Sequence, residues 1–298
     1  MLNLNPDDEI QQTTIINIII NITTAVLKQL FWTLTTNMGL VERAKPIISM
    51  KQEFLYKRIM LTENKKNYAG IITAELGKIL SKPDMDIKGL PILKKTSVPK
   101  ALRKKFVKIV EEDILKSKEI NLKTIINKYD DIEMTIENSI RDGKTEYLLP
   151  KNLEIIDTYK DPSTIEAVRA TLIWNACEPE DQIIPPEKIN LLKLNCTDSN
   201  DPRLLALKQT HPDKYNAIMK TVFNIGVTAP RIDISRFGFV CIAVPKSIEK
   251  IPDYLIPFID FKSMVNTNMS ASFILLKSLG LYCDEVKTVK YKSNIISI

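Results

Sequence analysis

The longest apolar pattern runs from Ile10 to Leu34 and has helical spacing, after an acidic first turn at 6–9 that favours a helix start. It predicts a long amphipathic helix packed on a sheet. The core-facing positions would be Ile15, Ile19, Ile22, Val26, Leu30 and Leu34. Polar residues interrupt the run, so it lacks an unbroken apolar span of about 20 residues and we expect no membrane partner.

A second pattern has period two and predicts a β-hairpin. Phe54, Tyr56, Arg58 and Met60 alternate with Leu55, Lys57, Ile59 and Leu61. The residues 62–64 end this strand as a turn, and the apolar run from Ala69 to Leu76 predicts the returning strand. Lys65, Lys66 and Tyr68 therefore stand at the start of the second strand.

Two cations beside a tyrosine suit a nucleic-acid backbone. Ammonium groups neutralise phosphates, while the ring or hydroxyl approaches a sugar or a base edge. Lys66-Asn67-Tyr68 alone more often marks a solvated turn than a ligand site, because exposed lysines are common. The triplet leaves both interpretations open.

A third pattern, from Lys88 to Lys108, combines a predicted helix with a run of positive charge. Lys88-Gly89-Leu90-Pro91 indicates a turn, and Ser97-Val98-Pro99 indicates a helix start. The helix would face the core through Leu102, Phe106, Ile109, Val110 and Ile114. Its stretch contains no acid, and its cations are Lys88, Lys94, Lys95, Lys100, Arg103, Lys104, Lys105 and Lys108. Lys100, Arg103 and Lys104 gather at the helix N-terminus, which favours phosphate, although a solvated basic face explains them equally well.

Composition narrows the fold class. The chain has 298 residues, enough for two or three compact units, and only 8 glycines. This favours a helix-rich α+β protein over a sandwich, a barrel or a Rossmann domain. The net charge is +6, but the segment 51–128 alone holds 19 Lys and Arg against 9 Asp and Glu. A local surplus of this kind predicts a polyanionic partner.

Cysteine and histidine usage argues against several chemistries. The four cysteines, at 177, 196, 241 and 283, form no CxxC pair, and His211 is the only histidine. A zinc cluster, a histidine-based triad and a disulfide framework are therefore disfavoured. We expect the cysteines to be reduced core residues.

Six short motifs, taken in order, resemble the end of the palm and the thumb of family B DNA polymerases of the bacteriophage replicative type. They are the strand leading into Lys66-x-Tyr68, Asp86-Ile87-Lys88-Gly89, Ser97-Val98-Pro99-Lys100-Ala101, the Arg-small-x-Leu pattern within 167–175, Ile184 to Leu192, and Val240 to Pro245 followed by 252–260. The resemblance implies a palm end at 1–86 and a thumb at 87–298. It extends over most of the chain.

The resemblance also implies roles for individual residues. Lys66 and Tyr68, with Lys65, would contact primer-template DNA near the primer terminus. The thumb contacts to the duplex would come from Lys88, Gly89, Lys94, Lys95, Lys100, Arg103 and Lys104. We expect no cofactor bound by this chain, because the two Mg²⁺ ions of the family are held by palm aspartates, one on an Asp-Thr-Asp strand that lies upstream of the Lys-x-Tyr element.

Three segments depart from the family pattern or imitate part of it. Thr197-Asp198-Ser199 imitates the metal-binding sequence, but Asn200-Asp201-Pro202 predicts a turn there, so we assign it no catalytic role. Extra material lies between Ser199 and Arg236, with a predicted helix from Pro212 to Asn224. The tail 291–298 lacks a paired-aromatic clamp peptide, which leaves a sliding-clamp partner undecided.

The hypothesis is a C-terminal subunit or fragment of a split viral DNA polymerase, acting in the host cytoplasm during phage infection. An N-terminal chain would supply the exonuclease, the fingers and the palm catalytic motifs, and this chain alone would be inactive. A non-catalytic duplex-DNA-binding or processivity factor remains an alternative. An α+β structural protein with a solvated basic face is a third.

Overall fold

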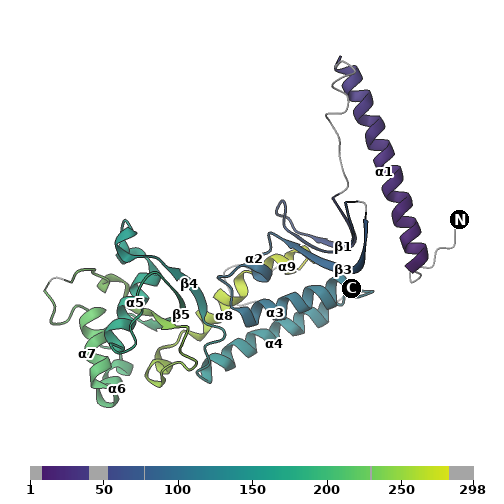
Figure 1. The fold of residues 1–298 in the computed structure, drawn as a ribbon. Helices are drawn as coiled ribbons and strands as arrows, with labels where there is room; N and C mark the ends of the chain where they lie inside the picture. The colour runs from purple at the N-terminus through teal and green to yellow at the C-terminus, as the bar shows by residue number, and fades with distance from the viewer. Residues whose placement is uncertain (1–8, 40–52, 77, 229, 282–298) are drawn as a thin grey trace. The chain divides into compact units, whose positions relative to one another are not determined.

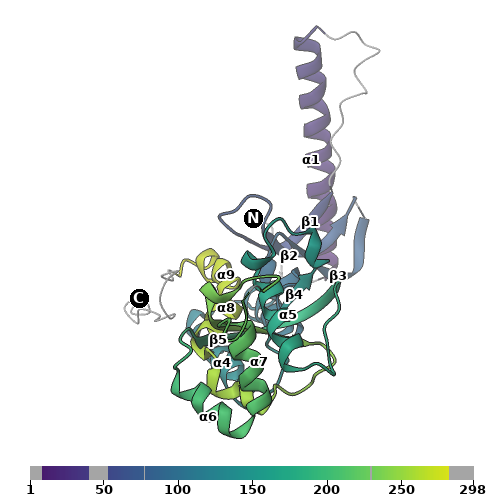
Figure 2. The same ribbon diagram turned by 90° about the vertical axis from the view of Figure 1, so that its left-hand side faces the viewer.

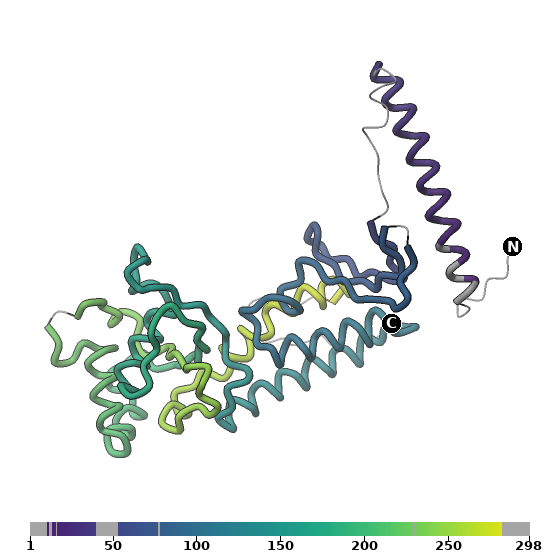
Figure 3. The backbone as a smooth tube through the Cα atoms, viewed as in Figure 1, coloured from purple at the N-terminus to yellow at the C-terminus, as the bar shows by residue number. Residues whose placement is uncertain are grey.

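The computed structural model describes residues 9–39, 53–76, 78–228 and 230–281 (Figure 3). It is a mixed α+β structure with two small antiparallel sheets, as the sequence predicts. The chain divides into two compact units, Met1–Lys88 and Gly89–Ile298. The predicted boundary lay two residues earlier, and the assignment of the units to palm and thumb stays a prediction.

The first unit begins with α1 (Glu9–Asn37), the predicted long helix. The prediction that its apolar face is packed on a sheet is wrong: Ile19, Ile22, Val26, Leu30 and Leu34 are between 45% and 59% exposed. Helical spacing shows which side of a helix is apolar, but it cannot show whether the covering surface belongs to the same chain.

Part of this helix also has the length and composition of a membrane span. Asn17–Asn37 covers 21 residues at a mean hydropathy of 1.3. One such helix near an N-terminus is weak evidence, since core helices and signal sequences have the same properties. The expectation of no membrane partner stays a prediction.

The first sheet contains β1 (Phe54–Leu61), β2 (Tyr68–Glu75) and β3 (Lys78–Lys88) in that order, all antiparallel (Figure 1). The predicted hairpin is confirmed. The third strand was not predicted, because its polar sequence, with Pro83 inside it, lacks the apolar alternation typical of a half-buried strand. A register shift in β1 around Tyr56 changes the simple alternation of that strand.

The second unit opens with a helical layer. Its elements are α2 (Pro91–Lys94), α3 (Lys100–Lys108), a π-helix (Ile109–Leu115), α4 (Leu122–Arg141), α8 (Phe261–Ser270) and α9 (Phe273–Ser278). All five predicted core residues of the basic helix are buried. Phe106 is fully buried with its ring 5.0 Å from that of Tyr129, and such a side chain contributes about 3–5 kcal/mol when compared with alanine.

The second sheet contains β4 (Leu149–Leu153), β5 (Glu187–Cys196) and β6 (Phe239–Pro245), also antiparallel (Figure 2). The helix α5 (Glu166–Cys177) packs on this sheet and on α7 (Pro212–Thr221), which in turn contacts α6 (Pro202–Thr210). Short 3₁₀ turns lie at Ile156–Thr158, Pro162–Thr164, Ser235–Phe237 and Asp253–Phe258. The predicted insertion at 199–236 thus contains two helices, one of them at the predicted place.

The cysteines behave as predicted where they are described. Cys177, Cys196 and Cys241 are free and buried. Cys283 and the tail 291–298 lie outside the described residues.

Candidate nucleic-acid interface

The hairpin turn presents its two lysines to solvent. Thr62 and Asn67 close the turn, with the Thr62 amide donating to the Asn67 carbonyl at 3.2 Å. Lys65 and Lys66 are exposed between them. Lys66 has φ of 65°, a left-handed conformation that is uncommon for a residue other than glycine. Both ammonium groups therefore extend from a defined turn next to the first residue of β2.

Tyr68 and Lys88 lie directly opposite each other in the first sheet. They form the first register pair of β2 and β3, so their side chains share one face. The motifs assign both residues to DNA contacts, and the sheet brings them together. A cation and a phenol ring on one face form a surface suited to a sugar-phosphate backbone.

Tyr56 and Asp86 hold Tyr68 on this face, and neither was predicted as a site residue. The Tyr56 hydroxyl donates to Asp86 Oδ2 at 2.8 Å and lies 3.3 Å from the Tyr68 hydroxyl. The two tyrosine rings meet edge to face, 5.8 Å apart at 78°. Burial, the Tyr68 hydrogen bond and the Asp86 carboxylate raise the pKa of Tyr56, so its hydroxyl stays a proton donor.

Gly70 makes room for this arrangement. A Cβ at this position would lie 2.5 Å from Cδ1 of Tyr56. The residue is buried in β2 beneath the tyrosine ring, so any side chain would displace that ring. The Gly70 backbone is therefore part of what sets the position of Tyr56.

The remaining predicted residues belong to the second unit. Gly89 precedes α2 with φ of 66°, Lys94 ends that helix, and Lys95 is its C-cap. Lys100 begins α3, whose N-cap, Pro99, provides no side-chain hydrogen bond to the first turn. The described cations among these residues are exposed or half-buried.

A cleft in the second unit gathers two of these cations with three that were not predicted. Its volume is about 520 Å³, and its cationic lining residues are Lys100, Arg103, Lys151, Lys188 and Lys246. They come from the start of α3, the edge strand β4, the start of β5 and the residue after β6. A smaller hollow of about 190 Å³ is lined by Lys95 and shares Lys151 with the cleft. Lys94 and Lys104 line neither hollow.

The charges of this basic cleft are unbalanced. None of its five cations forms an ion pair with any carboxylate in the part of the chain that the structure describes. Its lining contains one carboxylate, Glu146, which accepts a hydrogen bond of 2.9 Å from Ser139 Oγ. The Nε atom of Arg103 is buried without a hydrogen-bond partner. Elsewhere in the same unit, Lys128 and Lys214 are paired with Asp113 and Glu178 at 2.6 and 2.8 Å.

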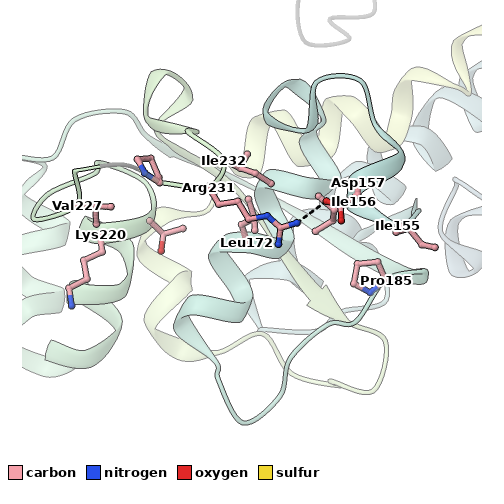
Figure 4. Close-up of a pocket in the computed structure, with 11 residues that line it drawn as sticks. Ile155, Ile156, Asp157, Leu172, Pro185, Lys220, Val227, Arg231 and Ile232 are labelled. Carbon is pink, nitrogen blue, oxygen red and sulfur yellow. Dashed lines mark hydrogen bonds and ion pairs between the residues drawn. The ribbon is translucent and has the colours of Figure 1, made fainter.

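A second hollow of about 500 Å³ has a different character (Figure 4). Apolar side chains such as Leu172, Pro185 and Ile232 line most of it. Arg231 extends to Asp157 at 2.9 Å, and both side chains are highly exposed, so the pair contributes little to stability. The insertion supplies part of the wall, and no predicted site residue lies there.

Two sequence motifs prove to have local structural roles. Arg169, of the Arg-small-x-Leu pattern, is buried, donates to the carbonyls of Ser163 and Thr164, and stacks 3.9 Å from the Phe237 ring. Asp198, of the Thr-Asp-Ser sequence, accepts from the Asn200 amide at 2.9 Å, which is the predicted turn. In the described segments, no three His, Cys, Asp or Glu side chains are arranged to hold a metal ion.

Comparison with known families agrees with the surface chemistry. The model of the family described as divergent family B DNA polymerase matches residues 6–295. The chain belongs to this family. Membership gives it a polymerase-related role, with DNA as the expected partner and nucleotidyl transfer as the expected chemistry of the family. No curated protein matches the chain.

Within this polymerase family member, sequence reasoning found one part of each surface. It assigned Tyr68 and Lys88 to DNA but not Tyr56 or Asp86, and it assigned Lys100 and Arg103 but not Lys151, Lys188 or Lys246. Lys188 and Asn190 alternate with buried Ile189 and Leu191. That alternation marks an exposed strand face, but the sequence does not show that α3 lies beside it.

Proposed function

We propose that this chain provides the end of the palm and the thumb of a split family B DNA polymerase and that it holds the primer-template duplex. The observation that carries the proposal is the Tyr68–Lys88 pair on one face of the first sheet. Lys65 and Lys66 extend from the adjoining turn and would add phosphate contacts.

These contacts would position DNA without reading its sequence. Lysine ammonium groups bind phosphate as point charges, and a tyrosine can approach sugars of any sequence. The Tyr56–Asp86 hydrogen bond would keep the Tyr68 ring in place while DNA slides past. A replicative enzyme requires this kind of sequence-independent positioning.

The catalytic metal ions would be held by another polypeptide, as the resemblance implies. We assign the exonuclease, the fingers and the palm aspartates that bind two Mg²⁺ ions to an upstream chain. We place the assembled enzyme in viral DNA replication in the host cytoplasm, and a sliding clamp stays an undecided partner.

The test is primer extension with the separate and the combined chains. We expect no extension from this chain alone, extension when the upstream chain is co-expressed, and co-purification of the two chains. Extension by this chain alone would refute the split arrangement. Tight primer-template binding without any captured polymerase chain would favour the non-catalytic DNA-binding factor, and undetectable binding would favour the structural protein.

The exposed apolar face of α1 is the part of the chain that we expect to pack on the upstream palm. Ile22 and Val26 lie on this face, and both are more than half exposed. Replacing both by aspartate should abolish co-purification, because unpaired carboxylates cannot be buried in an interface. Aspartates at Asn21 and Thr24, away from the centre of the apolar face, add the same charge and should leave it unchanged.

A further inference from the structure

The basic cleft of the second unit contains three lysines that the sequence analysis did not assign to DNA. We propose that it binds the sugar-phosphate backbone of one DNA strand, with Lys151, Lys188 and Lys246 as phosphate-binding residues beside Lys100 and Arg103. This inference rests on the proposed function and extends it to a defined site.

The sheet register explains how Lys188 and Lys246 reach one cleft, while Lys151 pairs with Ile189 and lines the cleft from the edge strand β4. Asn152 pairs with Lys188, and Pro150 pairs with Asn190, so these four side chains share one face of the sheet. Asn190 in turn pairs with Val244, two residues before Lys246. Three chain segments that are distant in sequence therefore place lysines around one hollow, next to the start of α3.

The electrostatics of the cleft favour a polyanion. Five cations face one carboxylate, and no described acid neutralises them through an ion pair. The Nε donor of Arg103 is buried without a hydrogen-bond partner, which costs free energy. Like charges held together in this way repel one another, and phosphate groups would remove that cost.

The uncharged lining residues indicate that the cleft binds a sugar-phosphate backbone and not a nucleobase. Thr96, Thr145, Asn152 and Asn190 offer hydroxyl and amide groups of the kind that contact phosphate and sugar oxygens. Among the described residues that line the cleft, none has an aromatic ring on which a base could stack. A volume near 520 Å³ also admits a small phosphorylated molecule, so the test must separate the two sources of phosphate.

The test measures binding of a fluorescent primer-template duplex to the full chain across a salt series. Lys188→Gln combined with Lys246→Gln should weaken binding by at least about tenfold at 0.1 M salt and reduce the log–log salt slope by about two. Lys160→Gln combined with Lys220→Gln removes the same charge from exposed positions outside the cleft and should leave the slope unchanged. Lys188→Arg combined with Lys246→Arg should retain binding.

Glu146→Gln provides the opposite test. Removing the one carboxylate of the cleft should tighten binding about threefold to tenfold, a gain that misfolding cannot imitate.

Three outcomes have distinct meanings. If the wild-type chain binds the duplex and the cleft and control variants behave alike, the cleft assignment is overturned while the proposed function stands. If the wild-type chain binds no duplex, the proposed function fails. If pyrophosphate displaces the duplex at equal phosphate concentration, the cleft takes a small anion and the backbone assignment is wrong.

Discussion

The hydrogen bond from Tyr56 to Asp86 is the contact in the first unit whose removal we expect to have the clearest effect. Tyr56→Phe removes one oxygen and keeps the ring that packs over Gly70. At 2.8 Å to a carboxylate, the bond belongs to the charged class, which contributes about 1.5–3 kcal/mol. Both residues are half-buried and water can compete, so we expect a loss of about 1.5 kcal/mol in the free energy of unfolding of this unit.

A double-mutant cycle isolates the bond. Tyr56→Phe, Asp86→Ala and the double variant should give a coupling energy of about 1 kcal/mol, because each single variant already removes the same interaction. Hydrogen exchange of the β2 amides measures the opening free energy of this sheet separately from the second unit.

The control is Tyr215→Phe, which removes a hydroxyl with no hydrogen-bond partner among the described residues and should change stability by less than about 0.5 kcal/mol. If the effects of Tyr56→Phe and Asp86→Ala are additive within about 0.3 kcal/mol, the bond does not stabilise the sheet. The claim that it holds Tyr68 in place would then be wrong.

Three further outcomes are expected from the second unit. Burial and the Asp130 charge raise the pKa of Glu133 to about 7. The folded chain therefore keeps this proton to a higher pH than the unfolded chain does, and the free energy of unfolding should fall as the pH rises from 4.5 to about 7. Glu133→Gln should remove this pH dependence of the free energy of unfolding, as urea titrations at several pH values can measure. An unchanged pH profile in the variant would contradict the assignment to Glu133. Gly238→Ala should cost about 3 kcal/mol in thermal unfolding, because its Cβ would lie 2.8 Å from the Thr197 backbone at φ of 72°. Gly226 also has a positive φ, of 78°, but nothing lies within 4 Å of a Cβ built there, so Gly226→Ala should lower the free energy of unfolding by only about 1 kcal/mol. Equal losses in the two alanine variants would refute the clash at Gly238. Burial raises the pKa of Cys177 to about 12, so maleimide should label it only after unfolding, as mass spectrometry can show.

Some of the local elements followed from the sequence, whereas α4 and β4 were not predicted. Period-two alternation located the hairpin, and helical spacing located α3 and its buried Phe106, because these periodicities arise from backbone geometry within one element. The strand β3 was not predicted, because its largely polar sequence, with Pro83 inside it, shows no apolar face.

The order of short motifs was also a property of the sequence. It pointed to family B DNA polymerases, and the family match over residues 6–295 agrees with it. The Lys-x-Tyr triplet alone could not distinguish a DNA contact from a solvated turn. Its pairing with Lys88 across the sheet became visible only in the structure.

The sequence by itself determined the helices and strands that have a clear apolar period, and where positive charge accumulates. Only the tertiary structure decided which charges meet. Lys100, Lys188 and Lys246 are far apart along the chain, and they meet at one cleft because strand pairing aligns the ends of β5 and β6 while the start of α3 lies beside them. The same reason explains the error at α1. A local pattern specifies the apolar side of an element, while the partner that covers that side depends on long-range packing, here proposed to involve another chain.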